Sequence, residues 1–268
     1  MRVPDLSNEF RDHVAVITGG GSGIGRAVAR RYAAAGGNVV VLGRREEPLQ
    51  ETVGLITRDG GAASFVSCDV RDATAMAQAI DGVVEREGRI DALVNNAAGN
   101  FVTPGENLSP NGWKAVIDIV LNGTFYATHA AAQHMLTAGS GNILNVIATY
   151  AWHGHPGTVH SAAAKGGVVA MTRTLAVEWA ARGVRVNCIA PGPTETEGAG
   201  QALWGTEAAR ARVRAGVPAG RMASPEEIAE SASFLMSERS DYITGEVMVV
   251  DGGQWLGKSI YTDERSKA

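Results

Sequence analysis

The sequence has 268 residues, of which 45% are hydrophobic and 19% charged, a balance typical of a globular protein rather than a disordered chain. A net charge of −4 and a pI near 5.9 give no global attraction to nucleic acid or to an anionic membrane, and no apolar run approaches the ~20 residues of a membrane span. Two distant cysteines, expected to be buried free thiols, and an N-terminus without the apolar core of a signal peptide favour a reduced, cytoplasmic protein.

Short apolar strands alternate with helical segments along the chain. After a polar arm at residues 1–12, the expected strands are His13–Thr18, Val39–Leu42, Ala63–Ser67, Asp91–Asn95, Asn142–Ile147, Val184–Ile189 and Val247–Val250. The expected helices run from the first glycine-rich turn to about Ala35, over Glu46–Arg58 and Ala73–Glu87, from Ser109 as N-cap to about Met135, over Val159–Arg182 and Glu207–Arg214, and onward from Ser224 as N-cap.

Apolar strands that alternate with helices in this way are typical of parallel strands buried on both faces. We therefore expect an α/β fold: one domain over residues 1–268 with a doubly wound (Rossmann) parallel sheet of about seven strands and helices on both faces. Residues 194–220 are expected to form a region over the substrate, and residues 254–268 a C-terminal tail.

A glycine-rich turn, T-G-G-G-S-G-I-G (Thr18–Gly25), follows the first strand and opens a helix. Glycines at this position let backbone N–H groups approach a pyrophosphate, which the helix N-terminus also favours. The second strand ends in L-G-R-R, without the carboxylate that binds the ribose hydroxyls in NAD enzymes. Arg44 and Arg45 suit the 2′-phosphate of NADP instead, so we expect NADPH/NADP as cofactor. The alternative is that one of these arginines only faces solvent.

The stretch Ala148–Lys165 reads A-T-Y-A-W-H-G-H-P-G-T-V-H-S-A-A-A-K and lies between a strand and a helix. Its three histidines stand on a loop with glycine and proline and without acidic partners, so we expect no metal site and assign these histidines to the substrate loop. The tyrosine and the lysine of this stretch are separated by fifteen residues, and Ser161 is the residue one helical turn before the lysine.

The spacing G-x-x-x-G-x-G of the first turn resembles the short-chain dehydrogenase/reductase family. That family generally places its catalytic tyrosine four residues before the lysine, with a serine thirteen residues further upstream. Here the tyrosine position holds Ser161 and the serine position holds Ala148. A serine hydroxyl is a much weaker acid than a phenol, so the usual reduction of a ketone is not expected.

The chain resembles one branch of that family, the 2,4-dienoyl-CoA reductases, most closely its bacterial members. The resemblance is carried by N-N-A-A-G-N-F (Asn95–Phe101), W-K-A-V-I-D-I-V-L-N-G-T (Trp113–Thr124), A-T-Y-A-W, V-H-S-A-A-A-K, T-R-T-L-A-V-E-W (Thr172–Trp179), A-P-G-P (Ala190–Pro193) and D-G-G-Q-W-L (Asp251–Leu256). In this branch the active tyrosine lies fifteen residues before the lysine, as Tyr150 does here. The resemblance implies catalytic roles for Tyr150, Lys165, Asn100, Ser161 and Asn122.

The same resemblance implies the residues that contact the ligands. Those expected at the cofactor are Gly19, Gly21, Ser22, Gly23, Ile24, Gly25, Arg44, Arg45, Asp69, Val70, Asn95, Ala97, Gly99, Lys165, Pro191, Gly192 and Thr194. Those expected at the acyl-CoA substrate are Asn100, Phe101, Trp152, Ser161 and Leu203. The family resemblance also implies a homotetramer.

This pattern implies NADPH-dependent reduction of 2,4-dienoyl-CoA in the oxidation of unsaturated fatty acids. Hydride adds to the far end of the diene, and Tyr150 and Asn100 donate to the thioester oxygen as a dienolate forms. Water then protonates the α carbon, which gives a 3-enoyl-CoA. The alternatives are a reductase of another enoyl- or oxoacyl-thioester or carbonyl, and a non-catalytic NADP-binding protein.

Each of these residues also has a structural interpretation. Tyr150 would be a core or rim aromatic beside Trp152, Asn100 a turn residue and Ser161 a packing residue. Arg210, Arg212 and Arg214 meet CoA phosphates in one interpretation and form a solvated helix face in the other.

Overall fold

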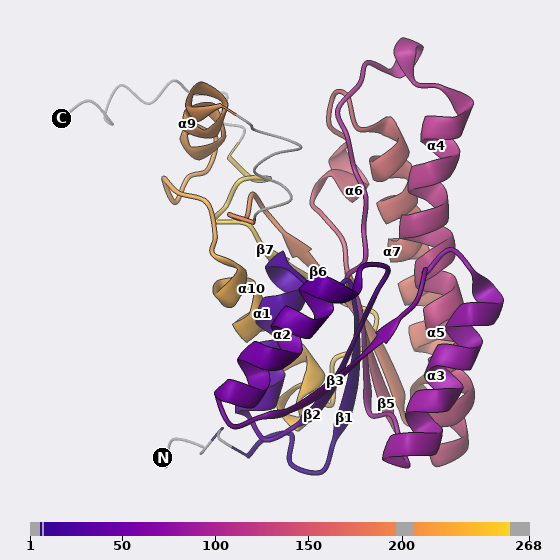
Figure 1. The fold of residues 1–268 in the computed structure, drawn as a ribbon. Coiled ribbons are helices and arrows are strands. Elements are labelled where there is room, and N and C mark those ends of the chain that lie inside the picture. The colour runs from indigo at the N-terminus through magenta and orange to yellow at the C-terminus, as the bar shows by residue number, and fades with distance from the viewer. Residues whose placement is uncertain (1–5, 7, 197–205, 258–268) are drawn as a thin grey trace.

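The computed structural model describes residues 6, 8–196 and 206–257, which are built around one sheet of seven parallel strands (Figure 1). The strand order is β3-β2-β1-β4-β5-β6-β7. The strands are β1 (Val14–Thr18), β2 (Asn38–Gly43), β3 (Ala62–Ser67), β4 (Ala92–Asn95), β5 (Gly141–Val146), β6 (Val184–Pro191) and β7 (Val247–Val250). The predicted doubly wound fold is confirmed.

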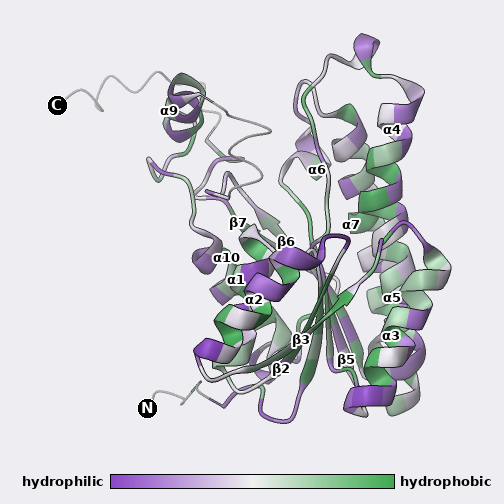
Figure 2. Cartoon of the chain, viewed as in Figure 1, coloured by the Kyte–Doolittle hydropathy of each residue, from purple (hydrophilic) through white to green (hydrophobic). Residues whose placement is uncertain are grey.

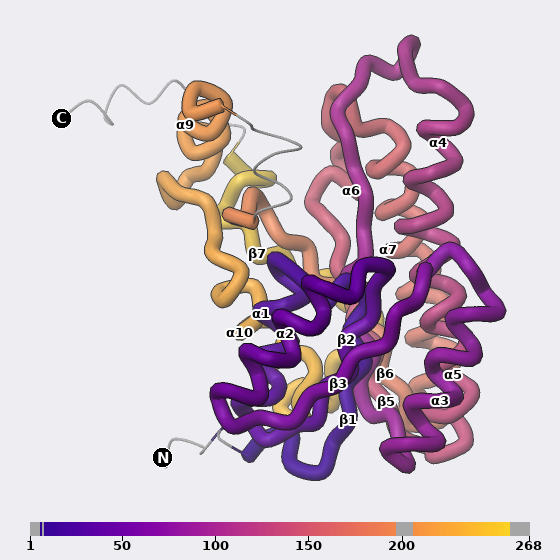
Figure 3. Tube along the Cα trace, in the orientation of Figure 1, coloured from indigo at the N-terminus to yellow at the C-terminus, as the bar shows by residue number. Residues whose placement is uncertain are grey.

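Helices cover both faces of the sheet, and the helices of each face lie side by side (Figures 1 and 3). On one face lie α1 (Gly23–Ala34), α2 (Glu46–Arg58) and α10 (Pro225–Met236). On the other lie α3 (Ala73–Glu87), α4 (Pro110–Ile117), α5 (Gly123–Ala138) and α7 (Val159–Trp179). Two further helices, α6 (Tyr150–His153) and α9 (Glu207–Ala215), lie beyond the carboxyl ends of the strands.

The strands are buried on both faces because successive side chains point to opposite sides of the sheet. In β1, Ala15 and Ile17 join the core under α1 and α10, whereas Val14 and Val16 join the core under α3 and α5. A continuous apolar run is therefore needed in each central strand, which is the pattern that predicted them.

Side-chain caps fix the starts of several helices. Asp72 accepts hydrogen bonds from the backbone N–H groups of Thr74 and Ala75 at the start of α3. Ser109 and Ser224 cap α4 and α10 as predicted, and Ser224 forms a capping box with Glu227. Each cap satisfies N–H groups that the first helical turn leaves without a partner.

The helix predicted from Ser109 to about Met135 contains one irregular turn. A π-helical segment, η2 (Asp118–Asn122), joins α4 to α5 and shifts the faces of the two helices. Helix α7 ends at Trp179, and the predicted remainder is the 3-10 turn η3 (Ala180–Arg182). A 3-10 turn, η1 (Gly105–Asn107), precedes α4 and another, η4 (Glu238–Ser240), follows α10.

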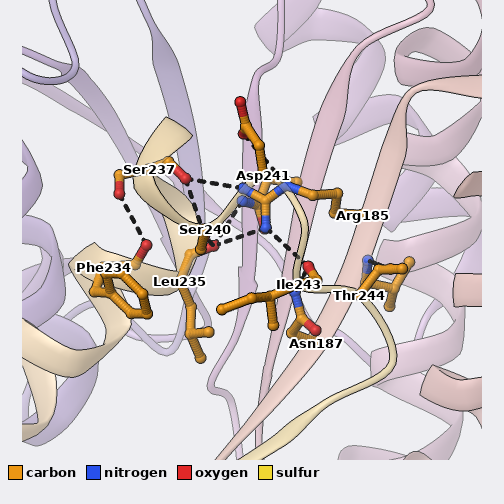
Figure 4. A network of polar contacts seen from close by, with 11 residues as sticks. Arg185, Asn187, Phe234, Leu235, Ser237, Ser240, Asp241, Ile243 and Thr244 are labelled. Carbon is orange, nitrogen blue, oxygen red and sulfur yellow. Dashed lines mark hydrogen bonds and ion pairs between the residues drawn. The ribbon is translucent and has the colours of Figure 1, made fainter.

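At the amino ends of the strands, Arg185 of β6 ties three segments together (Figure 4). Its guanidinium donates to the carbonyls of Leu235 and Ser237 at the end of α10 and of Ile243 before β7, at 3.0–3.2 Å. Asp241 is more distant, at 3.7 Å. Carbonyl dipoles therefore carry most of the neutralisation of this largely buried cation.

Candidate active site

A cavity of about 480 Å³ lies at the carboxyl ends of β1, β2, β3 and β4. It is lined by Gly19, Gly21, Ser22, Gly23, Ile24, Gly43, Arg44, Arg45, Pro48, Leu49, Cys68, Asp69, Val70, Asn96, Ala97, Ala98, Gly99, Asn100, Ile119 and Thr196. Most of the residues predicted to bind the cofactor are therefore brought together here, at the edge where ligands bind in doubly wound sheets.

The glycine-rich turn requires glycine for geometric reasons. Gly19 and Gly23 have φ angles of +65° and +51°, which L side chains rarely adopt. A Cβ on Gly25 would lie 2.4 Å from the carbonyl oxygen of Gly19, so Gly25 allows the turn to pack on α1 rather than lining the cavity. Ser22 makes no capping bond and the first turn of α1 has no acid, so its N–H groups are left for an anion.

Two side chains hold this turn in place. The Thr18 hydroxyl accepts from the backbone N–H groups of Asn96 and Ala97. The Asn96 amide donates to the carbonyls of Thr18 and Gly19, both at 3.1 Å. The shape of the turn is thus set by the protein's own hydrogen bonds.

Asn95 is not at the cavity, which corrects one predicted contact. Its side chain is buried and donates to Thr128 and to Asn145, at 2.9 and 2.8 Å. Asn95 is the last residue of β4 and faces the core, whereas its neighbour Asn96 turns towards the glycine-rich loop. Successive side chains of a strand point to opposite faces, and this alternation is the sequence signal that distinguishes the buried Asn95 from Asn96.

The cavity is positive where an adenosine ribose would lie. Arg44 and Arg45 follow β2 and line it, together with the carboxylate of Asp69. The Asp69 carboxylate is held by Arg71 at 2.5 Å, and this bond lowers the pKa of Asp69. Arg71 was missed in the sequence because only the fold shows that it turns back onto Asp69.

A second cavity of about 560 Å³ adjoins the first, with Ile24, Asn96, Ala98, Asn100 and Thr196 common to both linings. Its further lining residues are Val102, Val146, Ile147, Ala148, Thr149, Tyr150, His153, His155, Thr158, Lys165, Pro191, Gly192, Pro193, Thr194, Val213, Gln254 and Trp255. This lining is mainly apolar, and Lys165 is the one lysine or arginine in it among the described residues.

Three of the predicted catalytic residues meet at the wall of this cavity: Tyr150 and Asn100 line it, and Ser161 is buried behind them. The Tyr150 hydroxyl lies 3.0 Å from the Ser161 hydroxyl and is also hydrogen-bonded by the Asn100 side chain. Burial raises the pKa of Tyr150, and the bonds with Ser161 and Asn100 only partly oppose that effect. Tyr150 is therefore protonated at neutral pH and can donate a hydrogen bond.

The orientation of the Asn100 side-chain amide is fixed by the backbone N–H of the next residue, Phe101. Its Oδ1 accepts from the N–H of Phe101 at 2.9 Å, so its Nδ2 group is the end that points away from the loop. The amide can therefore act as a donor beside Tyr150, which is the polarity that an oxyanion requires.

Lys165 lies one helical turn after Ser161 on α7 and is buried. Its ammonium donates to the carbonyl of Val146 at the end of β5. Burial lowers its pKa to about 8, so it still carries charge at pH 7. Asn122 does not join this group: its amide donates to Asp118 of η2 at 2.9 Å.

The predicted substrate residues are divided between the cavity and its rim. Phe101 is partly exposed and packs edge-on against the buried His160, with ring centroids 4.5 Å apart. Trp152 packs edge-on against Trp255 of the cavity wall, at 5.7 Å. Leu203 lies outside the described residues.

Over the part of the chain that the structure describes, no three His, Cys, Asp or Glu side chains gather as a metal site would require. None of the described helices combines the length and hydropathy needed to cross a membrane.

Comparison with known sequences gives a consistent set of relatives. A family model described as enoyl-(acyl carrier protein) reductase matches residues 19–254. A Bacillus subtilis protein named probable 2,4-dienoyl-CoA reductase, (2E)-enoyl-CoA-producing, is 51% identical over 90% of this chain and 96% of its own length. The peroxisomal 2,4-dienoyl-CoA reductase of Danio rerio, named (3E)-enoyl-CoA-producing, is 39% identical over 94% of this chain and 84% of its own.

Solved structures of dehydrogenases have the same fold as this chain. A short-chain dehydrogenase from Bacillus anthracis superposes with a TM-score of 0.85 at 47% identity, over 94% of this chain and 99% of that one. A gluconate 5-dehydrogenase from Burkholderia cenocepacia in complex with NADP and tartrate gives a TM-score of 0.88 at 34% identity, over 94% and 98%.

Proposed function

Because the chain belongs to the short-chain dehydrogenase/reductase family, we propose that it reduces 2,4-dienoyl-CoA thioesters with NADPH in the oxidation of unsaturated fatty acids. The observation that carries this proposal is the meeting of Tyr150, Asn100 and Ser161 beside Lys165 in an apolar cavity. The family's usual tyrosine position is the one that Ser161 occupies, so the tyrosine hydroxyl that donates a hydrogen bond comes from a different point of the chain.

The residues of the first cavity suit NADPH. The φ angles of Gly19 and Gly23 keep the backbone open for a pyrophosphate, and Arg44 and Arg45 supply the charge that a 2′-phosphate needs. Pro191, Gly192 and Thr194 line the second cavity, where the nicotinamide would meet a substrate. NADPH, when bound, supplies the hydride.

The donors then act on the thioester oxygen. As the diene accepts hydride at C5, electron density moves through C4, C3 and C2 to the oxygen, and Tyr150 and Asn100 donate hydrogen bonds to it. Ser161 holds the tyrosine hydroxyl in place, and the charge of Lys165 favours the developing anion. These groups stabilise the dienolate more than the neutral substrate, which is what accelerates a reaction.

We propose that the proton is added at C2, from water, to give a 3-enoyl-CoA. C2 is the α carbon of the dienolate and carries a higher electron density than C4, so water protonates it faster. The names of the two relatives differ on this product, since one is (2E)-enoyl-producing and the other (3E)-enoyl-producing.

The lining of the second cavity distinguishes this substrate class from a sugar acid. A gluconate carboxylate and its hydroxyls need polar partners along their whole length, whereas most of the surface of this wall is apolar. Its polar side chains include His153, His155 and Gln254 besides the Tyr150 group and Lys165. An unsaturated acyl chain requires only one polar cluster, at its thioester.

The test follows NADPH absorbance with 2,4-dienoyl-CoA, 2-enoyl-CoA, 3-oxoacyl-CoA and gluconate, and then locates the double bond of the product by NMR. We expect turnover of the dienoyl substrate and a C3–C4 double bond in the product. Faster turnover of any other substrate would sink the proposed activity, and a C2–C3 double bond would sink the proposed site of protonation alone.

We further propose a homotetramer. Helices α4 and α5 are hydrophobic along much of their length (Figure 2), with Trp113 and Phe125 40% and 46% exposed, and Val177 of α7 is 83% exposed. Apolar side chains on adjacent helices mark a surface that another subunit can cover. The molar mass in solution, measured by light scattering, tests this assembly.

A further inference from the structure

The second cavity lies between two walls of unlike charge. One wall is formed by residues 100–108 and 150–158, which include a single carboxylate, Glu106, and no lysine or arginine. The other includes α9, whose nine residues contain three arginines and one glutamate. Figure 1 shows α9 across the open end of the sheet from α4 and α6.

The arginines of α9 surround a residue that lines the cavity. Val213 belongs to the lining, and Arg210 lies one helical turn before it, on the same face. Arg212 and Arg214 precede and follow Val213 directly, so they flank it on either side. α9 therefore presents its positive charge at the mouth of the cavity.

Within the part of the chain that the structure describes, only one of these three charges lies in an ion pair, although Glu207 also attracts Arg210 at longer range. Arg214 is paired with Glu207 of the same helix. Arg210 and Arg212 are exposed and form no ion pair within the described ranges. In a protein with a net charge of −4, this local excess suits an anion that enters the cavity only in part.

We propose that Arg210 and Arg212 bind the phosphate groups of the CoA part of the substrate. The CoA then leaves the cavity along α9, and the acyl chain lies against the opposite wall, where Phe101, Val102 and Trp152 expose apolar surface. This inference rests on the proposed function and adds the orientation of the substrate. The CoA end lies along the basic wall, and the acyl end lies along the wall without lysine or arginine. Guanidinium groups bind phosphate through paired hydrogen bonds, which makes arginine the suitable residue.

An acidic carrier protein would offer carboxylates to the same arginines. A stable protein interface, however, covers about 800 Å² on each partner, and two free arginines on a nine-residue helix fit a small polyanion better. CoA is therefore the favoured ligand, and a carrier protein is a separate outcome of the test.

The test compares a 2,4-dienoyl thioester of CoA with that of pantetheine, which has the same arm without the nucleotide. The variant is the double substitution Arg210→Gln, Arg212→Gln. Its matched control is Arg58→Gln, Arg182→Gln, which removes the same charge from exposed positions on other elements. We expect the variant to raise the KM for the CoA thioester about fivefold, as the loss of two exposed charge pairs gives, and to leave kcat and the KM for NADPH unchanged.

The pantetheine thioester should be reduced equally by the variant, the control and the wild type. Added salt should raise the KM for the CoA thioester in the wild type and hardly in the variant, because screening acts on charges that only the wild type retains. Equal effects on both thioesters, or no effect on either, would overturn the inference. So would an effect confined to a carrier-protein thioester.

Failure of the proposed function can be distinguished from failure of the arginine site. If the wild type reduces neither thioester, calorimetry of CoA binding to the NADP-saturated protein replaces kinetics. Binding that the variant weakens and the control retains then supports the arginine site, and binding that neither alters overturns it.

Discussion

At the scale of single residues, the proposed chemistry depends on Tyr150 as a protonated donor. We expect Tyr150→Phe to lower kcat with 2,4-dienoyl-CoA by about 10²–10³, the usual loss for one oxyanion donor. The KM for NADPH should be unchanged, because Tyr150 lines the second cavity and not the first. Steady-state kinetics in both substrates measures the two effects.

The control is Tyr126→Phe on α5, since Tyr126 lines neither cavity. Equal rates in Tyr150→Phe and in the wild type would remove Tyr150 from the mechanism. A similar loss in Tyr126→Phe would instead indicate a general effect on the fold.

Lys165 makes a prediction about pH. Its pKa is about 8 when folded and near 10.5 when unfolded, because burial disfavours the charged form. Between those pH values the unfolded chain binds more protons, so stability rises with pH. The free energy of unfolding of the wild type should therefore rise relative to that of Lys165→Met from pH 8 to 10.5, and the difference should be flat below pH 8.

Urea unfolding of the cofactor-free proteins at a series of pH values measures this difference. Parallel curves across the whole range would contradict a depressed pKa for Lys165. Loss of hydride transfer in Lys165→Met at pH 7, measured at saturating NADPH because Lys165 is also an expected cofactor contact, is the accompanying functional expectation.

At the scale of elements, Arg185 joins the end of α10 to the segment before β7. Arg185→Met removes three hydrogen bonds from a charged donor, while Asn142, Ser240 and Asn187 still donate to the same three carbonyls. We expect a loss of about 2 kcal/mol in the free energy of unfolding. The Tm should fall by roughly 4–8 °C for a chain of this length.

Kinetics should distinguish this from an effect on the site. Arg185 lies at the amino end of β6, and the cavities lie at the carboxyl ends, so KM and kcat should stay unchanged below the Tm. Arg221→Met, which breaks an exposed pair with Glu227, is the control and should hardly alter the Tm. If Arg185→Met has the same Tm as Arg221→Met, the carbonyl contacts of Arg185 contribute little to the free energy of unfolding.

At the scale of the whole molecule, cofactor binding should stabilise the fold. At ~100 times its Kd, NADP should raise the Tm by roughly 5–10 °C. NAD at the same concentration should raise it less, because Arg44 and Arg45 have a 2′-phosphate to bind only in NADP. Thermal shifts with both cofactors measure the preference.

The double variant Arg44→Gln, Arg45→Gln should make the two shifts similar. A difference between NADP and NAD that stays unchanged in this variant would exclude these arginines as the source of the preference.

Much of the fold could be predicted from the sequence because each central strand is buried on two faces and must be apolar throughout. The caps at Ser109 and Ser224 were predictable for a different reason, because a side-chain cap depends only on residues next to it in the sequence. The π turn at Asp118–Asn122 was not, since one extra residue barely changes a helical pattern.

The candidate site was predictable where a spacing has a chemical meaning. Tyr150, Ser161 and Lys165 lie on one short stretch, and the structure brings them together with Asn100. Asn96 and Arg71 were missed because their roles depend on which way a side chain turns after a strand ends. The burial of Asn95 could have been inferred from strand alternation.

The hydrogen bonds of Thr18 and Asn96 to the glycine-rich turn have a kinetic consequence. A turn already held in shape loses little entropy when a ligand arrives, so encounter is slowed by diffusion and orientation rather than by rearrangement. Differences in affinity between related cofactors then lie mainly in how long each stays bound. We therefore expect Arg44 and Arg45 to lengthen the residence time of the proposed cofactor, NADP, and so to slow the exchange of spent for fresh cofactor between turnovers.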